Sequence, residues 1–137
     1  MYPSDGVVLV VDNDLATLKL VTANLNQLGY RTVCKETAEE ALELVRNESP
    51  AVIVLELSLP GMNGFQFLAE LRRTVKGRQI PVIVWTVKDL SSDERLRLRH
   101  SAEAIVPRDG ASELLKQLNP YLTGAQREQS NSPRGSA

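Results

Sequence analysis

Five short apolar segments recur along the chain, and each is followed by a stretch whose apolar residues have helical spacing. The first, Val7–Val11, contains no polar residue, as expected of a strand buried on both faces of a sheet. Alternating strands and helices predict an α/β fold, in which helices cover both faces of a parallel sheet. With five strands, we expect the flavodoxin-like (βα)5 doubly wound arrangement with strand order 2-1-3-4-5. The predicted strands are residues 7–11, 30–34, 51–55, 80–85 and 104–106.

Local signals at the helix ends support this division of the chain. The helical pattern of residues 15–28 is followed by Gly29, which is expected to form a C-terminal cap. Thr37 is a suitable N-cap, and Glu40 lies three residues later, as in a capping box. The next helix is therefore predicted to begin directly after Thr37.

The length and composition of the chain indicate one globular domain. We predict that it covers residues 1–122, followed by a disordered C-terminal tail at 123–137, because the tail is too polar to build a core. The formal net charge of -1 gives no general attraction to nucleic acid or to an anionic membrane, so neither is expected as a partner. Cys34 is the single cysteine, and no apolar run approaches the roughly 20 residues of a membrane span, so we expect a cytoplasmic protein.

Polar side chains follow the predicted strands at the edge where their carboxyl ends meet. Asp12 and Asn13 follow the first strand, and Glu56 follows the third. Thr86 follows the fourth strand, and Arg108 comes shortly after the fifth. Ligands of open parallel sheets bind at this edge. The residues therefore predict a site suited to a hard cation and a phosphoryl group.

Three segments resemble the receiver domain of bacterial response regulators, the signalling proteins of two-component and phosphorelay systems. They are Val10–Asp14, the stretch Val52–Phe65 with its Leu-Pro-Gly-Met-Asn-Gly loop, and Pro81–Thr86. The resemblance extends over residues 7–122. Thr86–Leu90 is also similar to a segment found in the receiver modules of hybrid histidine kinases. The resemblance implies a phosphorylation pocket at the carboxyl edge of the sheet.

The resemblance also implies a role for each position of that pocket. Asp12 matches an acid that helps to bind magnesium, and Thr86 matches the hydroxyl that contacts the phosphoryl group. Five positions depart from the family's pattern. They are Asn13 at the second acid, Glu56 at the phospho-acceptor aspartate, Val87 at a small residue of the pocket mouth, Ile105 at the switch aromatic and Arg108 at the lysine.

Glu56 is the departure with the greatest consequence for phosphorylation. Its carboxylate is displaced by roughly 1–1.5 Å relative to that of an aspartate, which can slow a positioned nucleophile on the order of a hundredfold. Two interpretations remain open. Glu56 either imitates phosphoaspartate permanently, or it belongs to a pocket that is closed.

The cation site is expected to be weakened. Asn13 removes one formal charge, whereas magnesium prefers carboxylate oxygens in near-ideal octahedral geometry. The residues do not identify a cofactor. Mg²⁺ is expected to bind weakly or not at all, with Asp12 and Glu56 as its ligands if it binds. Asp14 could compensate for Asn13 only if the loop turned it inward.

Arg108 keeps the positive charge of the lysine but presents a planar fork that suits a carboxylate. Our leading hypothesis is an ion pair with Glu56, and the alternative is an arginine that points into solvent. Ile105 cannot act as an aromatic switch. Trp85 is the nearest large aromatic, and we interpret it as a core or interface residue. Val87 is expected to narrow the pocket mouth.

Two functions are consistent with these residues. The first is a pseudo-receiver, a binding module and not an enzyme, which signals through protein contacts without an ordinary phosphorylation cycle. The second is an active receiver that a histidine kinase phosphorylates on Glu56 or a nearby acid. A flavodoxin-like cofactor binder is a remote third, because the first loop lacks glycines and hydroxyls for a phosphate.

The expected partners are a histidine kinase or a downstream effector, with the chain itself a monomer or a homodimer. Resemblance to the family implies contact through the fourth helix, the fifth strand and the last helix. Arg95, Arg97 and Arg99 make that fourth helix basic. It is either an ordinary solvated face or a docking surface for an acidic partner.

Overall fold

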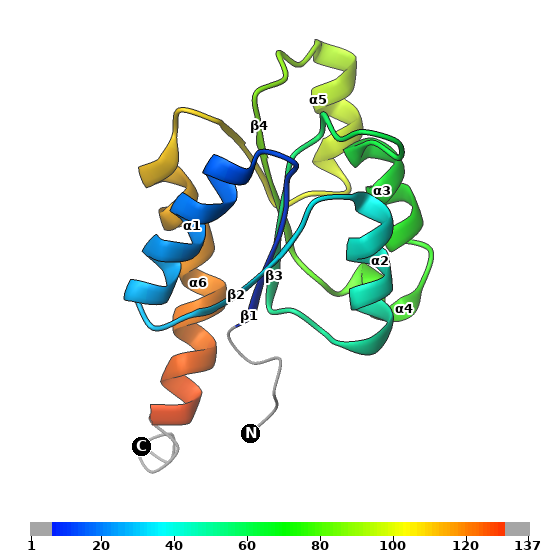
Figure 1. The fold of residues 1–137 in the computed structure, drawn as a ribbon. Helices are drawn as coiled ribbons and strands as arrows, with labels where there is room; N and C mark the ends of the chain where they lie inside the picture. Colours follow the sequence, from blue (N-terminus) through cyan, green and yellow to red (C-terminus); the bar gives the residue numbers. More distant parts are fainter. Residues whose placement is uncertain (1–6, 131–137) are drawn as a thin grey trace.

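Five strands form one parallel sheet in the computed structural model, which describes residues 7–130 and the side chains as far as Leu122 (Figure 1). The strand order is β2-β1-β3-β4-β5, and every pairing is parallel. The predicted flavodoxin-like topology is therefore confirmed. The strands are β1 (Val7–Val11), β2 (Arg31–Lys35), β3 (Val52–Leu55), β4 (Val82–Thr86) and β5 (Ala104–Pro107).

Helices cover both faces of this sheet (Figure 1). On one face lie α1 (Leu15–Gln27) and α6 (Ala111–Ser130). On the other lie α2 (Ala38–Asn47), α3 (Gly64–Leu71) and α5 (Ser92–Arg99). Each face has its own hydrophobic core, and the two cores are separated by the sheet.

The continuous apolar run of β1 is explained by its central place in the sheet. Its five residues are at most 1% exposed. Leu9 and Val11 pack into the core beneath α2, α3 and α5, whereas Val8 and Val10 pack into the core beneath α1 and α6. Side chains alternate between the faces with a period of two, so a strand buried on both faces needs apolar residues at every position.

The predicted caps are present where the helices begin and end. The Thr37 hydroxyl accepts a hydrogen bond from the Glu40 amide at 3.1 Å and caps α2. Gly29 follows the C-cap of α1 with φ of 92°, in the left-handed region that glycine adopts without strain. Strands β2 and β4 begin one and two residues later than predicted, at Arg31 and Val82.

A short helix, α4 (Val75–Arg78), was not predicted from the sequence. Four residues are too few to show a helical period of apolar residues. Thr74 caps the turn by accepting a hydrogen bond from the Gly77 amide at 2.9 Å. A Cβ atom at Gly77 would lie 1.8 Å from the carbonyl oxygen of Leu71, so the close return of the chain against α3 requires glycine.

Helix α6 continues to Ser130, beyond the predicted end at about Leu122. Residues 123–130, which were predicted to belong to a disordered tail, are helical instead. This segment contains Ala, Gln, Arg and Glu, which favour propagation of a helix that has already formed. The rest of the predicted tail, 131–137, and the first six residues of the predicted domain lie outside the described residues. Among residues 7–130, no helix is both long and apolar enough to cross a membrane.

Candidate functional site at the carboxyl edge

Glu56 is the first residue after β3, and its side chain is almost completely buried. Its amide donates to the carbonyl oxygen of Val11 at 3.0 Å, which extends the pairing of β3 with β1 by one residue. This pairing places Glu56 beside the end of β1. With 3% exposure, its carboxylate needs hydrogen-bond partners from the protein.

The Glu56 carboxylate receives those partners from three loops. The Ser58 amide donates to Oε2 at 3.0 Å, and the Val87 amide donates to Oε1 at 3.1 Å. The Thr86 hydroxyl donates to Oε2, and Arg108 Nη2 donates to Oε1 at 2.7 Å. A carboxylate has about four acceptor sites, so four donors leave Glu56 with its hydrogen-bonding capacity filled.

Arg108 joins the two buried carboxylates of the site. Its Nη2 atom lies 2.5 Å from Asp12 Oδ2 and 2.7 Å from Glu56 Oε1. The predicted ion pair with Glu56 is therefore confirmed, and the alternative of an arginine that points into solvent is wrong, because the side chain is only 20% exposed. We refer below to Asp12, Glu56 and Arg108 as the carboxylate–arginine cluster.

The orientation of Arg108 is held by residues on both sides of it. Nη1 donates to the Thr17 hydroxyl at 3.0 Å, and Nη2 approaches the Trp85 carbonyl oxygen at 3.3 Å. The guanidinium carbon lies 4.5 Å from the centre of the Trp85 ring, within the range of a cation–π contact. Arg108 is therefore clamped between α1 and β4, which limits its freedom to leave the carboxylates.

Asp12 lies at the end of β1 and is 2% exposed. Burial raises the pKa of its carboxyl, and the negative charge of Glu56 adds to this effect. The Asp14 amide, which donates to Asp12 Oδ1 at 2.9 Å, and the Arg108 guanidinium both oppose the rise in pKa. The net direction shows that burial outweighs the favourable partners of Asp12.

The two residues after Asp12 do not join the cluster. Asn13 is exposed. Asp14 is exposed as well, and it caps α1 by accepting hydrogen bonds from the Ala16 amide at 3.1 Å and the Thr17 hydroxyl at 2.9 Å. The Thr17 hydroxyl is the largest of the causes that lower the pKa of Asp14. Asp14 is thus committed to the helix end and does not turn inward to replace the acid missing at Asn13.

Thr86 and Val87 contribute to the site in different ways. The Thr86 side chain is buried, and its hydroxyl accepts from the Lys88 amide at 3.0 Å while it donates to Glu56. Val87 contributes its backbone amide, whereas its side chain is 64% exposed. That side chain borders an open hollow together with Leu90 and Ile105. The predicted narrowing of the pocket mouth by Val87 stays a prediction.

The residue at the switch position and the nearest aromatic lie on opposite faces of the sheet. Ile105 is half-buried and packs against the core beneath α2, α3 and α5. Trp85 is 4% exposed and belongs to the core beneath α1 and α6. Trp85 therefore does not occupy the place of a switch aromatic on β5. Its interpretation as a core residue is confirmed, and its contact with Arg108 was not foreseen.

Other members of the site were missed from the sequence as well. Thr17 lies on α1, 91 residues from Arg108, and no local signal connects the two. The amides of Ser58 and Val87 serve as donors regardless of their side chains. Trp85 alone carried a usable signal. Successive side chains of a strand point to opposite faces of the sheet. Trp85 directly precedes Thr86, so its side chain lies on the face of β4 opposite to the Thr86 side chain.

The residues of the cluster do not fit a magnesium ion. Magnesium needs free oxygen ligands in octahedral geometry, and it is repelled by a nearby cation. Arg108 Nη2 lies between the Asp12 and Glu56 oxygens that would serve as ligands, and Asn13 carries no charge. Among residues 7–122, whose side chains the structure describes, no group of three or more His, Cys, Asp or Glu side chains is arranged to hold a metal ion. The guanidinium takes the place of a metal as the counter-charge for both carboxylates.

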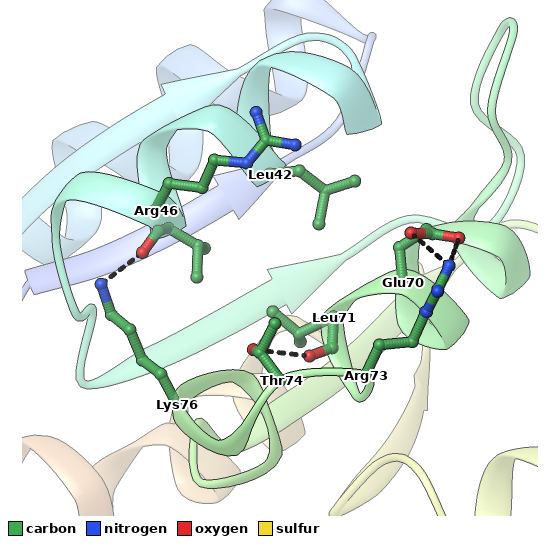
Figure 2. Close-up of a pocket in the computed structure, with 8 residues that line it drawn as sticks. Leu42, Arg46, Glu70, Leu71, Arg73, Thr74 and Lys76 are labelled. Atoms are coloured by element: carbon green, nitrogen blue, oxygen red, sulfur yellow. Dashed lines mark hydrogen bonds and ion pairs between the residues drawn. The ribbon is translucent and has the colours of Figure 1, made fainter.

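A second hollow, of about 430 Å³, lies among α2, α3 and α4 (Figure 2). Its rim is basic, but the basic groups already have partners in the protein. Arg73 pairs with Glu70 at 3.4 Å, and Lys76 Nζ donates to the Val45 carbonyl oxygen at 2.5 Å (Figure 2). Since α4 leads into the amino end of β4, this hollow lies away from Thr86 and the carboxylate–arginine cluster.

Comparison with known proteins agrees with the fold. The family model of the response regulator receiver domain matches residues 8–119, and the chain therefore belongs to this family. The protein PilH of Pseudomonas aeruginosa is 31% identical over 118 residues, which cover 85% of this chain and 98% of PilH. The response regulator MprA of a Mycobacterium species is 31% identical over 116 residues, which cover 84% of this chain and 50% of MprA.

Solved structures show the same fold at lower sequence identity. The receiver domain of the sensor histidine kinase PA1611 from P. aeruginosa, which has a magnesium ion in its active-site cleft, superposes with a TM-score of 0.76. It is 22% identical and covers 86% of this chain and 98% of its own. The chemotaxis protein CheY4 of Vibrio cholerae has a TM-score of 0.77 at 24% identity, covering 85% of this chain and 98% of its own.

Proposed function

We propose that this receiver domain is a pseudo-receiver, which signals through protein contacts without an ordinary phosphorylation cycle. The observation that carries the proposal is the saturation of Glu56, whose carboxylate already accepts four hydrogen bonds, one of them from Arg108. A carboxylate held in this way is a poor nucleophile, because attack on a phosphoryl donor requires it to lose partners that burial makes difficult to replace.

The same geometry favours one of the two interpretations of Glu56. A mimic of phosphoaspartate would present negative charge to the surface or to a switch residue. Here the charge of Glu56 is buried and paired with Arg108, which it shares with Asp12, and Ile105 offers no aromatic side chain to move. We therefore interpret Glu56 as an internally satisfied residue, with neither a catalytic activity nor a magnesium cofactor in the working state of the domain.

The surface proposed for signalling is formed by α5, β5 and the start of α6. Arg95, Arg97 and Arg99 on α5 are exposed, and Leu96 among them is 53% exposed. Exposed apolar groups within a basic surface suit a partner with a complementary acidic surface. We expect the domain to be cytoplasmic and its partner to be a histidine kinase or a downstream effector, which the domain meets as a monomer or a homodimer.

The competing function is an active receiver phosphorylated on Glu56 or a nearby acid. It is supported by the Thr86 hydroxyl, which donates to the Glu56 carboxylate and matches the hydroxyl that contacts the phosphoryl group in the family. The two functions differ in one measurable property, which is whether the chain gains a phosphoryl group from a small donor.

The test is incubation with phosphoramidate or acetyl phosphate and Mg²⁺, followed by intact mass measurement. We expect no adduct on the unchanged protein. A combined Glu56→Asp, Arg108→Lys, Asn13→Asp variant should gain one phosphate, because it restores the nucleophile, the cation site and the lysine. Glu70→Asp, at an exposed glutamate of α3, is the matched control and should gain none. A stoichiometric adduct on the unchanged protein would show that the domain is an active receiver.

A further inference from the structure

Exposed leucines gather on the face of the domain that α1 and α6 form side by side (Figure 1). Among the residues whose side chains are described, seven large hydrophobic side chains are exposed, and four of them lie at these two helices. They are Leu15, Leu20, Leu28 and Leu115, with exposures of 57%, 61%, 55% and 37%. Leu20 and Leu115 line one hollow between the helices, and Leu28 and Leu115 line a second. Leu20, Leu28 and Leu115 therefore form one apolar patch, which we call the leucine patch.

The centre of the leucine patch is polar but uncharged. Asn24 lies one helical turn after Leu20 and one turn before Leu28, so it occupies the middle of the patch on α1, and it is exposed. The residues that line the two hollows include two charged ones, Arg108 and Lys116. The charge of Arg108 is committed to the carboxylate–arginine cluster. The surface therefore offers apolar groups around an amide, with Lys116 as the one charge beside it.

The chemistry of α1 differs from that of α5, which belongs to the surface proposed for signalling. Five of the eight residues of α5 are charged, whereas α1 has one charged residue, Lys19, among thirteen. Leu96 of α5 is 53% exposed, much like the leucines of the patch, but it lies between Arg95 and Arg97. Two copies that met through α5 would place arginines against arginines, and like charges oppose association. The leucine patch carries no such penalty, and it offers little charge by which to select an acidic or a basic partner.

We propose that the leucine patch is the interface through which two copies of this chain form a homodimer with two-fold symmetry. In such a dimer each patch contacts the same patch of the other copy, so the patch must be complementary to itself. Leucines meet this condition, and so does Asn24, because an amide side chain both donates and accepts hydrogen bonds. With Asn24 at the two-fold axis, the two amides pair with each other and the leucines of both copies pack around them.

The size of the patch sets the strength of this association. α1 has 13 residues and is about 20 Å long, so a contact along it and the flank of α6 buries less than the roughly 800 Å² per partner of a standard interface. The dimer is therefore reversible, with a dissociation constant in the micromolar range or weaker. Because α5 lies on the opposite face of the sheet, dimerisation leaves both basic surfaces free (Figure 1). The interface does not depend on whether Glu56 can be phosphorylated, and its test is separate from that of the proposed function.

Sedimentation velocity of the full-length chain, at concentrations from about 10 µM to about 1 mM, measures the association directly. We expect the sedimentation coefficient to rise with concentration, from the value of a monomer toward that of a dimer. A chain that stays monomeric throughout would overturn the proposal and leave the leucine patch to a different protein.

Two exposed apolar residues provide a matched pair of variants for the same measurement. Leu20→Glu places a carboxylate in the leucine patch and should weaken the association about tenfold or more. Val75, on α4, is 65% exposed and lies on the other face of the sheet, so Val75→Glu should leave the association unchanged (Figure 1). Both changes are at exposed side chains, and urea unfolding should show that both variants remain folded. A dimer that Leu20→Glu leaves intact, or equal effects of the two variants, would overturn the proposed interface.

The two-fold arrangement is tested by cross-linking through position 24. Cys34 is the single cysteine of the chain, so Cys34→Ser removes the native thiol and Asn24→Cys adds one at the centre of the patch. At a two-fold axis this thiol lies beside its own copy, and a mild oxidant should join the two copies by a disulfide. Asn26→Cys is the matched control, since Asn26 is exposed but lies about 200° round α1 from position 24, and it should cross-link about tenfold more slowly. Equal rates at the two positions would overturn the contact at Asn24.

Discussion

Two arginines of this domain are buried to a similar degree, yet they are held by different kinds of partner. Arg72, at the end of α3, has 19% of its side chain exposed, and Arg108 has 20%. Arg72 donates to the carbonyl oxygens of Ser101, Gly77 and Ile80 at distances of 2.5–3.2 Å. It therefore ties the end of α3 to the 77–80 segment and to Ser101, whereas its ion pair with Glu103 is longer, at 3.9 Å, and the Glu103 side chain is 43% exposed.

Arg108 instead bridges the carboxylates of Asp12 and Glu56. The difference lies in what would remain if the arginine were removed. Carbonyl oxygens left without a donor are polar but uncharged, whereas two buried carboxylates would repel each other in a medium of low dielectric constant. The comparison shows that Arg72 acts as a structural clamp and Arg108 as a built-in counter-ion. Only the second role can change the chemistry at the carboxyl edge of the sheet.

The largest expected effect comes from Arg108→Met, which leaves both carboxylates buried without their cation. We expect the free energy of unfolding at pH 7 to fall by about 3–5 kcal/mol, as when one partner of a buried ion pair is removed. Burial raises the pKa of Asp12, and its protonation relieves this repulsion, so acidification toward pH 5 should reduce the loss. Urea unfolding followed by Trp85 fluorescence at both pH values measures the effect.

The matched control for that experiment is Arg72→Met. Its loss should be about 2–3 kcal/mol, from carbonyl groups that lose their donors, and it should be similar at pH 7 and pH 5. If the two variants showed the same dependence on pH, the distinction between a structural clamp and a counter-ion would be contradicted.

A smaller effect is expected from Asp12→Asn, which removes one buried charge but keeps an oxygen for the Asp14 amide. Because burial raises the pKa of Asp12 in the folded state, the folded protein binds its proton more tightly than the unfolded chain does. The contribution of Asp12 to stability therefore falls as pH rises from its ordinary value near 3.8 through the raised pKa. Asp12→Asn should remove this fall and destabilise the domain at pH 7 less than Arg108→Met does.

Urea unfolding from pH 3 to pH 7 measures the contribution of Asp12, with the unchanged protein as reference. The opposite result is a stability that falls more steeply with rising pH in Asp12→Asn than in the unchanged protein. It would show that the attraction of Arg108 for the Asp12 carboxylate outweighs the effect of burial on its pKa. The pairing with Arg108 would then dominate the electrostatics of the cluster.

The smallest effect is expected from Thr17→Val, which replaces a hydroxyl by a methyl group of similar size. The change removes the hydrogen bond from Arg108 Nη1 and the one to Asp14. We expect a loss of about 1 kcal/mol, since Arg108 keeps both carboxylates and the Trp85 ring. A double-mutant cycle with Arg108→Lys, measured by urea unfolding, should show that part of this loss disappears. Strict additivity would mean that Thr17 does not orient Arg108.

Much of the site could be predicted because it depends on strand order. Once Val7–Val11 and Val52–Leu55 are recognised as neighbouring buried strands, Asp12 and Glu56 must lie side by side at their carboxyl ends. The charge of Arg108 after the fifth strand then makes an ion pair with Glu56 a reasonable prediction, and the structure confirms it. The helix α4 could not be predicted in the same way, because it depends on the return of the chain against Leu71.

The amino-acid sequence by itself determined the order of strands and helices, the parallel sheet and the set of polar residues at its carboxyl edge. The reason is that the burial of a strand and the spacing of apolar residues along a helix can be read from consecutive residues. Only the tertiary structure decided that Arg108 bridges Asp12 as well as Glu56, that Trp85 stacks against it, and that the exposed leucines of α1 and α6 form one patch. These features depend on backbone donors, side-chain orientation and the packing of α1 against α6, which bring together residues far apart in the chain.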